Sequence, residues 1–132
     1  MTTLAAPPLS RRRSIADVLE DARSRLDRLT PAQAVAARAA GAVVVDIRPA
    51  AQRAVQGGPD GVLVIERNVL EWRFDPQSDA ALPIASYDLE VVVLCQEGFT
   101  SSLAAAALQD LGIHRATDVA GGWAAWRDEL DA

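Results

Sequence analysis

Four short runs of apolar residues mark the strands that we expect in this chain. They span residues 42–47, 62–65, 90–94 and 116–119. Segments with helical spacing or turn-forming residues separate them. Near-continuous apolar strands that alternate with helices are typical of a parallel sheet buried on both faces. The pattern therefore predicts an α/β fold with a central parallel sheet flanked by helices.

Helical periodicity predicts an extra helix ahead of these strands. Apolar residues recur at helical spacing from Ile15 to Leu29. Ser14 and Asp17 resemble a capping box in which aspartate replaces glutamate. We therefore expect an amphipathic helix over residues 14–29.

Local start and stop signals predict the remaining helices. Thr30 is an expected N-cap, Pro31 stands at the first helical position, and Gly41 ends this helix near Ala40. The other helices are expected over residues 70–74, 100–111 and 123–130. Segments rich in Pro, Gly, Asp and Ser are expected to be connecting loops over residues 50–61 and 75–88.

The length of the chain fits one domain with a core of its own. It has 132 residues, and a chain of this size buries a substantial core on folding. We expect a disordered arm over residues 1–13, the N-terminal helix over 14–29 and the folded domain over 30–132.

Polar residues and glycines follow the predicted strands. The carboxyl ends of parallel strands meet at one edge of a sheet, where ligands bind. The groups expected to face one crevice are Asp46 with Arg48, Glu66-Arg67-Asn68, Cys95 with its loop, and Gly121-Gly122-Trp123.

Cys95 is the only cysteine and the strongest candidate for chemistry. It follows the apolar strand and precedes a short polar loop containing Gly98, and then an alanine-rich helix. Backbone N–H groups of such a loop converge on the sulfur, and the helix dipole points its positive end at it. Both effects favour the nucleophilic thiolate. A buried structural cysteine is the alternative interpretation.

Composition and charge exclude several classes of function. The net charge of −5 disfavours nucleic acid or an anionic membrane as a partner. All thirteen basic residues are arginine, which excludes Schiff-base chemistry and a P-loop lysine. One cysteine permits no internal disulfide and no cysteine-based metal cluster. Without a secretory signal or an apolar span of about 20 residues, a cytoplasmic location is expected.

Three motifs together resemble the signatures of a rhodanese domain. They are Val45-Asp46-Ile47-Arg48-Pro49, Cys95-Gln96-Glu97-Gly98-Phe99-Thr100-Ser101 and Gly121-Gly122-Trp123-Ala124-Ala125-Trp126. The resemblance covers roughly residues 28 to 130. It implies a rhodanese-like three-layer fold and sulfurtransferase chemistry, in which the cysteine accepts a sulfane sulfur as a persulfide and passes it to an acceptor.

The resemblance also implies a set of site residues. Cys95 is the expected catalytic residue. The expected substrate- and persulfide-binding loop is Gln96, Glu97, Gly98, Phe99, Thr100 and Ser101. The expected supporting residues are Asp46, Arg48, Arg67 and Trp123. No cofactor and no metal are implied. The expected partners are a small sulfur donor and a thiol or cyanide-like acceptor, and a homodimer is left open.

The residue types of the loop suit this chemistry. Backbone N–H groups from Glu97 to Ser101 can stabilise an anionic sulfur as an oxyanion hole stabilises oxygen. Thr100 and Ser101 can add hydroxyl donors and cap the helix that follows. No general base is required for a thiolate, which fits the position of the only histidine, His114, beyond that helix. Without a second cysteine, an outside nucleophile must discharge the persulfide.

Charge in the loop departs from the rhodanese pattern. Glu97 lies where many rhodanese loops carry a basic residue. A like-charge contact at about 4 Å costs about 4 kcal/mol at an effective dielectric of about 20. Either Glu97 points to solvent or the donor is not a simple dianion such as thiosulfate. Arg48, Arg67 and Arg73 are the candidate compensating charges, and Arg67 is preferred.

Two other functions remain as alternatives. A Cys-based phosphatase or arsenate reductase would need an arginine six residues after the cysteine to clamp the oxyanion, but position 101 is serine. A catalytically weak rhodanese module could sense persulfides or bind a partner. Among the supporting residues, Asp46 with Arg48 could be a structural ion pair, and Trp123 could be packing.

Overall fold

The computed structural model describes residues 5–130 and is built around a four-stranded parallel sheet. The strands, in the spatial order β2-β1-β3-β4, are β2 (Leu63–Val64), β1 (Val43–Asp46), β3 (Val91–Leu94) and β4 (Thr117–Asp118). Asp46 is paired with Val64 on one side and with Leu94 on the other. The predicted parallel sheet is confirmed, and each strand lies inside the run that predicted it.

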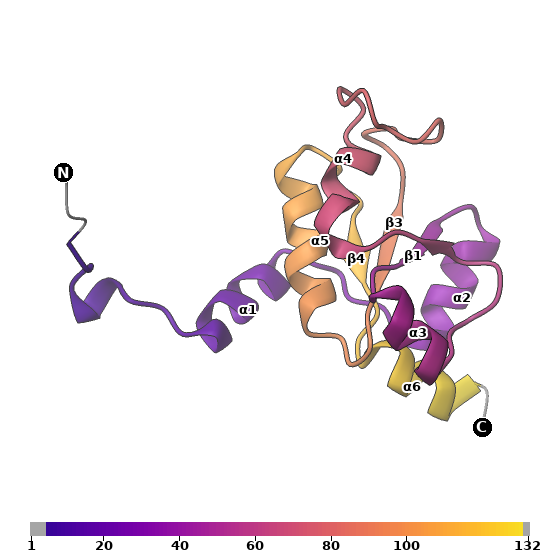
Figure 1. Ribbon diagram of the computed structural model, residues 1–132, viewed down its shortest axis with the longest axis horizontal. Coiled ribbons are helices and arrows are strands. Elements are labelled where there is room, and N and C mark those ends of the chain that lie inside the picture. Colours follow the sequence, from indigo (N-terminus) through magenta and orange to yellow (C-terminus); the bar gives the residue numbers. More distant parts are fainter. Residues whose placement is uncertain (1–4, 131–132) are drawn as a thin grey trace.

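Helices surround the sheet on both sides (Figure 1). They are α2 (Pro31–Ala39), α3 (Ala50–Gln56), α4 (Leu70–Phe74), α5 (Thr100–Asp110) and α6 (Gly122–Leu130). The N-terminal helix α1 (Ile15–Ser24) packs on α5, away from the sheet. Two 3-10 turns, η1 (Leu9–Arg11) and η2 (Arg67–Val69), complete the described chain. The expected flanking helices are therefore present, and so is the N-terminal one.

Two hydrophobic cores lie on the two faces of the sheet because strand side chains alternate in direction. The first core combines strand residues with α4 and α5, and includes Val45, Val91, Val93, Cys95, Phe74, Ala104 and Leu108. The second core combines strand residues with α2 and α6, and includes Val44, Val92, Leu94, Ala34, Trp123 and Trp126. Cys95 thus has the same orientation as Val93 and faces α5.

Capping boxes fix the starts of α1 and α2. The Ser14 hydroxyl accepts a hydrogen bond from the Asp17 N–H at 3.0 Å, and the Asp17 carboxylate accepts one from the Ser14 N–H at 3.0 Å. Thr30 and Gln33 form the same reciprocal pair ahead of α2. Both predicted helix starts are confirmed.

The helix predicted to reach Leu29 ends at Ser24. Beyond it the chain runs along β4, where the Leu29 N–H donates to the Asp118 carbonyl at 3.0 Å and the Leu29 carbonyl accepts from the Ala120 N–H at 2.8 Å. Leu26 is buried in the first core and Leu29 packs against the second. Leu26 and Leu29 therefore belong to two separate cores and do not continue the apolar face of α1.

The structure corrects the prediction of a loop over residues 50–61. Helix α3 occupies Ala50–Gln56, directly after Pro49. None of its residues is buried, so the helix has no apolar face from which to predict it. Alanine-rich composition and the proline before the first turn favour the helix instead.

The predicted arm over residues 1–13 is only partly covered, because residues 1–4 lie outside the described chain. Its described part contains the turn η1, in which no residue is buried.

Candidate active site

The sulfur of Cys95 lies in a cradle of backbone donors at the carboxyl end of β3. The N–H of Gly98 is 3.3 Å from Sγ and the N–H of Ser101 is 3.4 Å from it. Ser101 belongs to the first turn of α5, so its N–H lies at the positive end of the helix dipole. Cys95 is only 4% exposed. Two donors and a helix N-terminus therefore favour negative charge on this sulfur.

Gly98 and Gly122 permit the backbone to approach closely around the loop. Gly122 has φ +60°, and a Cβ there would lie 2.4 Å from the Cys95 carbonyl oxygen. The N–H of Trp123 donates to that same carbonyl at 2.8 Å. A Cβ on Gly98, at φ +85°, would lie 2.8 Å from the Gly121 nitrogen. The start of α6 is thus pressed against the Cys95 loop, with no room for side chains between them.

A buried ionic network forms the wall behind the loop. Asp46, at the end of β1, is fully buried and accepts hydrogen bonds from Arg48 at 2.6 Å and from Arg53 at 3.0 Å. Arg48 also donates to the Gln96 side-chain oxygen at 2.9 Å. Its guanidinium lies 5.9 Å from the centre of the Trp123 ring. Arg53 was not among the predicted site residues, because it lies on helix α3, which the sequence pattern did not reveal.

A second buried carboxylate, Asp118 of β4, fixes the far side of the loop. It accepts hydrogen bonds from the Ser101 hydroxyl at 2.8 Å, the Ser102 hydroxyl at 2.7 Å and Arg28 Nε at 2.9 Å. Ser101 and Ser102 belong to the first turn of α5, and Arg28 belongs to the chain before α2. Asp118 therefore joins these two segments. Asp118 and Arg28 were also missed by sequence reasoning, since nothing local links residues so far apart.

The sulfur borders a cavity of about 430 Å³. The residues that line it are Ile47, Arg48, Pro49, Gln52, Gln56, Arg67, Cys95, Gln96, Glu97, Phe99 and Thr100. The structure therefore brings Arg48, Arg67 and the Cys95 loop to one opening, as expected for residues at the carboxyl ends of parallel strands. Asp46 and Trp123 lie behind Arg48 and do not line the opening.

The charges at this opening differ from the sequence-based expectation. Arg67, the preferred compensating cation, pairs with Glu71 at 2.6 Å. Arg73 donates to the Ala80 carbonyl and is not among the lining residues. Glu97 is exposed and lines the cavity.

Two predicted roles in the helix cap are wrong. The N-cap of α5 is Phe99, and no side chain caps this helix. The Ser101 hydroxyl is directed to Asp118, because a buried carboxylate is the stronger acceptor. Thr100 is exposed and lines the cavity.

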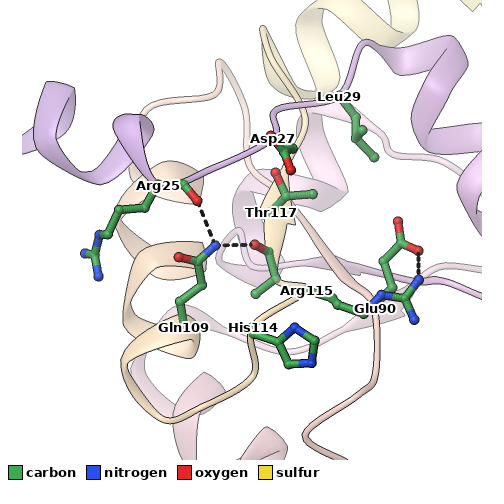
Figure 2. Close-up of a pocket in the computed structure, with 9 residues that line it drawn as sticks. Arg25, Asp27, Leu29, Glu90, Gln109, His114, Arg115 and Thr117 are labelled. Atoms are coloured by element: carbon green, nitrogen blue, oxygen red, sulfur yellow. Dashed lines mark hydrogen bonds and ion pairs between the residues drawn. The ribbon is translucent and has the colours of Figure 1, made fainter.

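A separate cavity of about 350 Å³ lies at the other ends of the strands from Cys95 (Figure 2). His114, Arg115, Glu90 and Thr117 are among its lining residues, and Arg115 pairs with Glu90 at 2.9 Å. It lies at the amino-terminal ends of β3 and β4, away from Cys95. His114 therefore cannot serve Cys95 as a base.

No group of three His, Cys, Asp or Glu side chains within residues 5–130 could hold a metal ion. Over the same residues, no helix is long and apolar enough to cross a membrane.

Comparisons with known proteins agree with this geometry. The model of the family described as "Rhodanese-like domain" matches residues 30–129. A protein of unknown function from Rhodopseudomonas palustris, described as a possible tyrosine phosphatase, is 36% identical; the match has a TM-score of 0.80 and covers 93% of this chain and 96% of that one.

More distant structures share the fold. The human single-domain sulfurtransferase TSTD1 is 23% identical, with a TM-score of 0.66, and the match covers 77% of this chain and 96% of that one. The reduced CoADR-RHD protein of Bacillus anthracis is 20% identical, with a TM-score of 0.66, over 82% of this chain and 18% of that one. No curated protein sequence matches the chain significantly.

Proposed function

The chain belongs to the rhodanese-like domain family, and from this we propose that it transfers a sulfane sulfur from a small donor to a thiophilic acceptor through a persulfide on Cys95. The family fold supports sulfurtransferase-type activity in general. The observation that carries the specific proposal is the sulfur cradle. Two backbone N–H groups lie 3.3 and 3.4 Å from Sγ, and the cavity beside it can admit a small donor.

The reaction takes two displacement steps. The Cys95 thiolate attacks the sulfur that is transferred, and a new S–S bond forms. In thiosulfate or glutathione persulfide the donor's S–S bond breaks; in mercaptopyruvate the C–S bond breaks, and pyruvate leaves as its enolate, which then takes a proton. With thiosulfate as donor, sulfite leaves with the bonding electron pair. An acceptor thiolate or cyanide then attacks the terminal sulfur of the persulfide, and the Cys95 thiolate leaves with the electron pair of that S–S bond.

The surrounding residues have distinct parts in this scheme. The N–H groups of Gly98 and Ser101 stabilise the anionic sulfur because they are held in place before the reaction. Arg48 holds the Gln96 side chain at the cavity wall. Asp46 fixes Arg48 from behind and does not touch the reacting atoms.

A phosphatase activity is the second candidate, because the Rhodopseudomonas protein is described as a possible tyrosine phosphatase. The corresponding loop chemistry requires an arginine at position 101 to bind the phosphoryl oxygens. Ser101 stands there, and its hydroxyl is already committed to Asp118. We therefore favour sulfur transfer.

Intact mass spectrometry tests the proposal directly, because the protein has one cysteine. The protein is incubated separately with thiosulfate, mercaptopyruvate and glutathione persulfide. We expect one added sulfur from at least one donor, its removal by cyanide or a thiol, and no addition to Cys95→Ser. No uptake from any donor would reject sulfur transfer and, without hydrolysis of p-nitrophenyl phosphate, leave a non-catalytic module. Cys95-dependent hydrolysis of p-nitrophenyl phosphate without sulfur uptake would favour the phosphatase.

A further inference from the structure

Two arginines from the chain ahead of the matched family region hold the Cys95 loop. Arg23 Nη2 donates to the Gly98 carbonyl at 2.8 Å, and Arg28 Nη2 donates to the same oxygen at 3.0 Å. Both residues precede position 30, where the family match begins. Gly98 is the residue whose N–H donates to the sulfur. Gly98 is therefore held through both of its backbone polar groups: its N–H donates to the sulfur, and its carbonyl oxygen accepts from two guanidinium groups.

The two guanidinium groups differ in their charge partners. Arg28 pairs with the buried carboxylate of Asp118 at 2.9 Å, so its charge is matched locally. Arg23 donates to the Ser102 hydroxyl at 3.1 Å and lies 5.6 Å from the centre of the Phe99 ring. No carboxylate within the described residues forms an ion pair with Arg23. Of the two arginines bound to the Gly98 carbonyl, Arg23 is therefore the one without a carboxylate partner.

The other charges around Cys95 are largely paired. Asp46 is bound by two arginines, and Arg67 is bound by Glu71. Glu97 forms no ion pair within the described chain and lines the cavity. The charged groups around Cys95 and its loop, with their ion-pair partners, are Asp46, Arg48, Arg53, Arg67, Glu71, Glu97, Asp118, Arg28 and Arg23. Arg48 and Arg53 share the single negative charge of Asp46, whereas Arg23 and Glu97 form no ion pair within the described chain.

We propose that Arg23 is a positioning residue for Cys95: it fixes the Gly98 carbonyl, whose residue donates its N–H to the sulfur, and it places a positive charge beside the loop that favours negative charge on the sulfur. This inference rests on the proposed role of Cys95 as a nucleophile. The guanidinium is anchored at three points, by Gly98, Ser102 and the face of Phe99. A fixed charge in a partly buried position acts more strongly than an exposed one, because water and salt screen it less.

The rate of Cys95 alkylation by iodoacetamide, measured against pH, tests the inference. This reagent is neutral, so a change in protein charge does not alter its approach, and intact mass counts its addition to the only cysteine. For Arg23→Gln we expect the midpoint of the pH profile to rise by about 0.5 unit or more, with alkylation below the midpoint about threefold slower. Arg23→Lys keeps the charge and should recover most of the rate.

Arg25→Gln is the matched control. Arg25 lies two residues away and pairs with the exposed Asp110 at 2.6 Å, so this variant has the same net charge change away from the loop. Its profile should coincide with that of the parent protein. If the Arg23→Gln profile coincided with that of Arg25→Gln, the inference would be rejected. Transient opening of a less stable variant would expose Cys95, which is 4% exposed in the folded protein, and would make its alkylation faster, whereas the inference predicts slower alkylation. Urea titrations of each variant at the lowest and highest pH of the profile show whether it stays folded.

The alkylation result is separable from the proposed sulfur transfer. Iodoacetamide reports the ionisation of the sulfur without any sulfur donor. A shifted midpoint in a protein that takes up no sulfur would support Arg23 and reject the transferase. Sulfur uptake with an unshifted midpoint would support the transferase and reject the role of Arg23.

Discussion

Glu97 and Arg23 place opposite charges on different sides of the Cys95 loop. Glu97 lies at the cavity, where we propose that a donor enters, and Arg23 binds the carbonyl of Gly98. A dianionic donor that used this cavity would approach a negative charge on its way to the sulfur. We therefore expect donors of low charge, such as an organic persulfide, to be used better than thiosulfate.

Replacing Glu97 with arginine should improve the use of thiosulfate. The substitution changes the local charge by two units at the cavity, and we expect kcat/KM for thiosulfate to rise about three- to tenfold at low ionic strength, with the gain shrinking in salt. Steady-state rates at two salt concentrations measure the effect. Glu129→Arg, at the exposed end of α6, makes the same charge change and should leave the rate near the parent value. An unchanged or lower rate for Glu97→Arg would show that Glu97 does not face the donor.

Some residues of the site can be predicted from the sequence and others cannot, because their partners lie at very different distances along the chain. Cys95, Gly98 and Ser101 lie within one short motif, so the cradle can be anticipated from local sequence. Arg23 and Arg28 reach the same loop from 75 and 70 positions away. Only the folded chain brings them together, and neither Arg23 at the end of α1 nor Arg28 beyond it carries a local sequence sign of that contact.

Strands and most helices of this fold follow closely from sequence because burial gives them a pattern. β3 is buried throughout, and its apolar run predicts it within one residue. Helix α3 buries nothing and was missed, although it carries Arg53 to the Asp46 carboxylate. The end of α1 was misplaced because apolar spacing alone cannot tell one helix face from two separate cores.

The contact between the start of α6 and the Cys95 loop predicts a sharp sensitivity at Gly122. Alanine there must adopt φ +60° and place its Cβ 2.4 Å from the Cys95 carbonyl oxygen. We expect Gly122→Ala to lower the free energy of unfolding by about 3 kcal/mol and to slow sulfur uptake. Urea unfolding and intact mass give the two readouts.

Gly41→Ala separates backbone strain from the collision. Gly41 also has positive φ, +111°, but a Cβ there would meet nothing within 4 Å. This variant should lose about 1 kcal/mol and keep full sulfur uptake. Equal losses in the free energy of unfolding of the two variants would mean that the close approach at Gly122 adds nothing to the backbone strain.

At the scale of the whole molecule, the chain ahead of α2 is joined to the sheet as well as to the loop. Arg28 pairs with Asp118, and Leu29 pairs with the backbone on either side of Val119. Gln109 of α5 donates to the Arg25 carbonyl at 3.1 Å, as Figure 2 shows. These contacts make residues 25–29 part of the folded unit, although the family match begins at residue 30.

Proline at position 29 should therefore weaken the whole fold. Leu29→Pro removes the N–H that donates to the Asp118 carbonyl, and we expect the free energy of unfolding to fall by about 2 kcal/mol. Leu29→Val keeps this N–H and should lose about 1 kcal/mol or less. Urea titrations of both variants measure the difference. Similar midpoints would indicate that the backbone bridge contributes little to stability.

The backbone pairing of Leu29 with β4 also affects whether the sheet can pair with another molecule and aggregate. Unpaired backbone groups along the edge of a sheet can recruit a strand from another chain and begin aggregation. Leu29 occupies the outer side of β4, and the opposite edge, β2, has only two residues, Leu63 and Val64. One edge of the sheet is thus covered and the other is too short to template an incoming strand, so the fold resists edge-to-edge polymerisation.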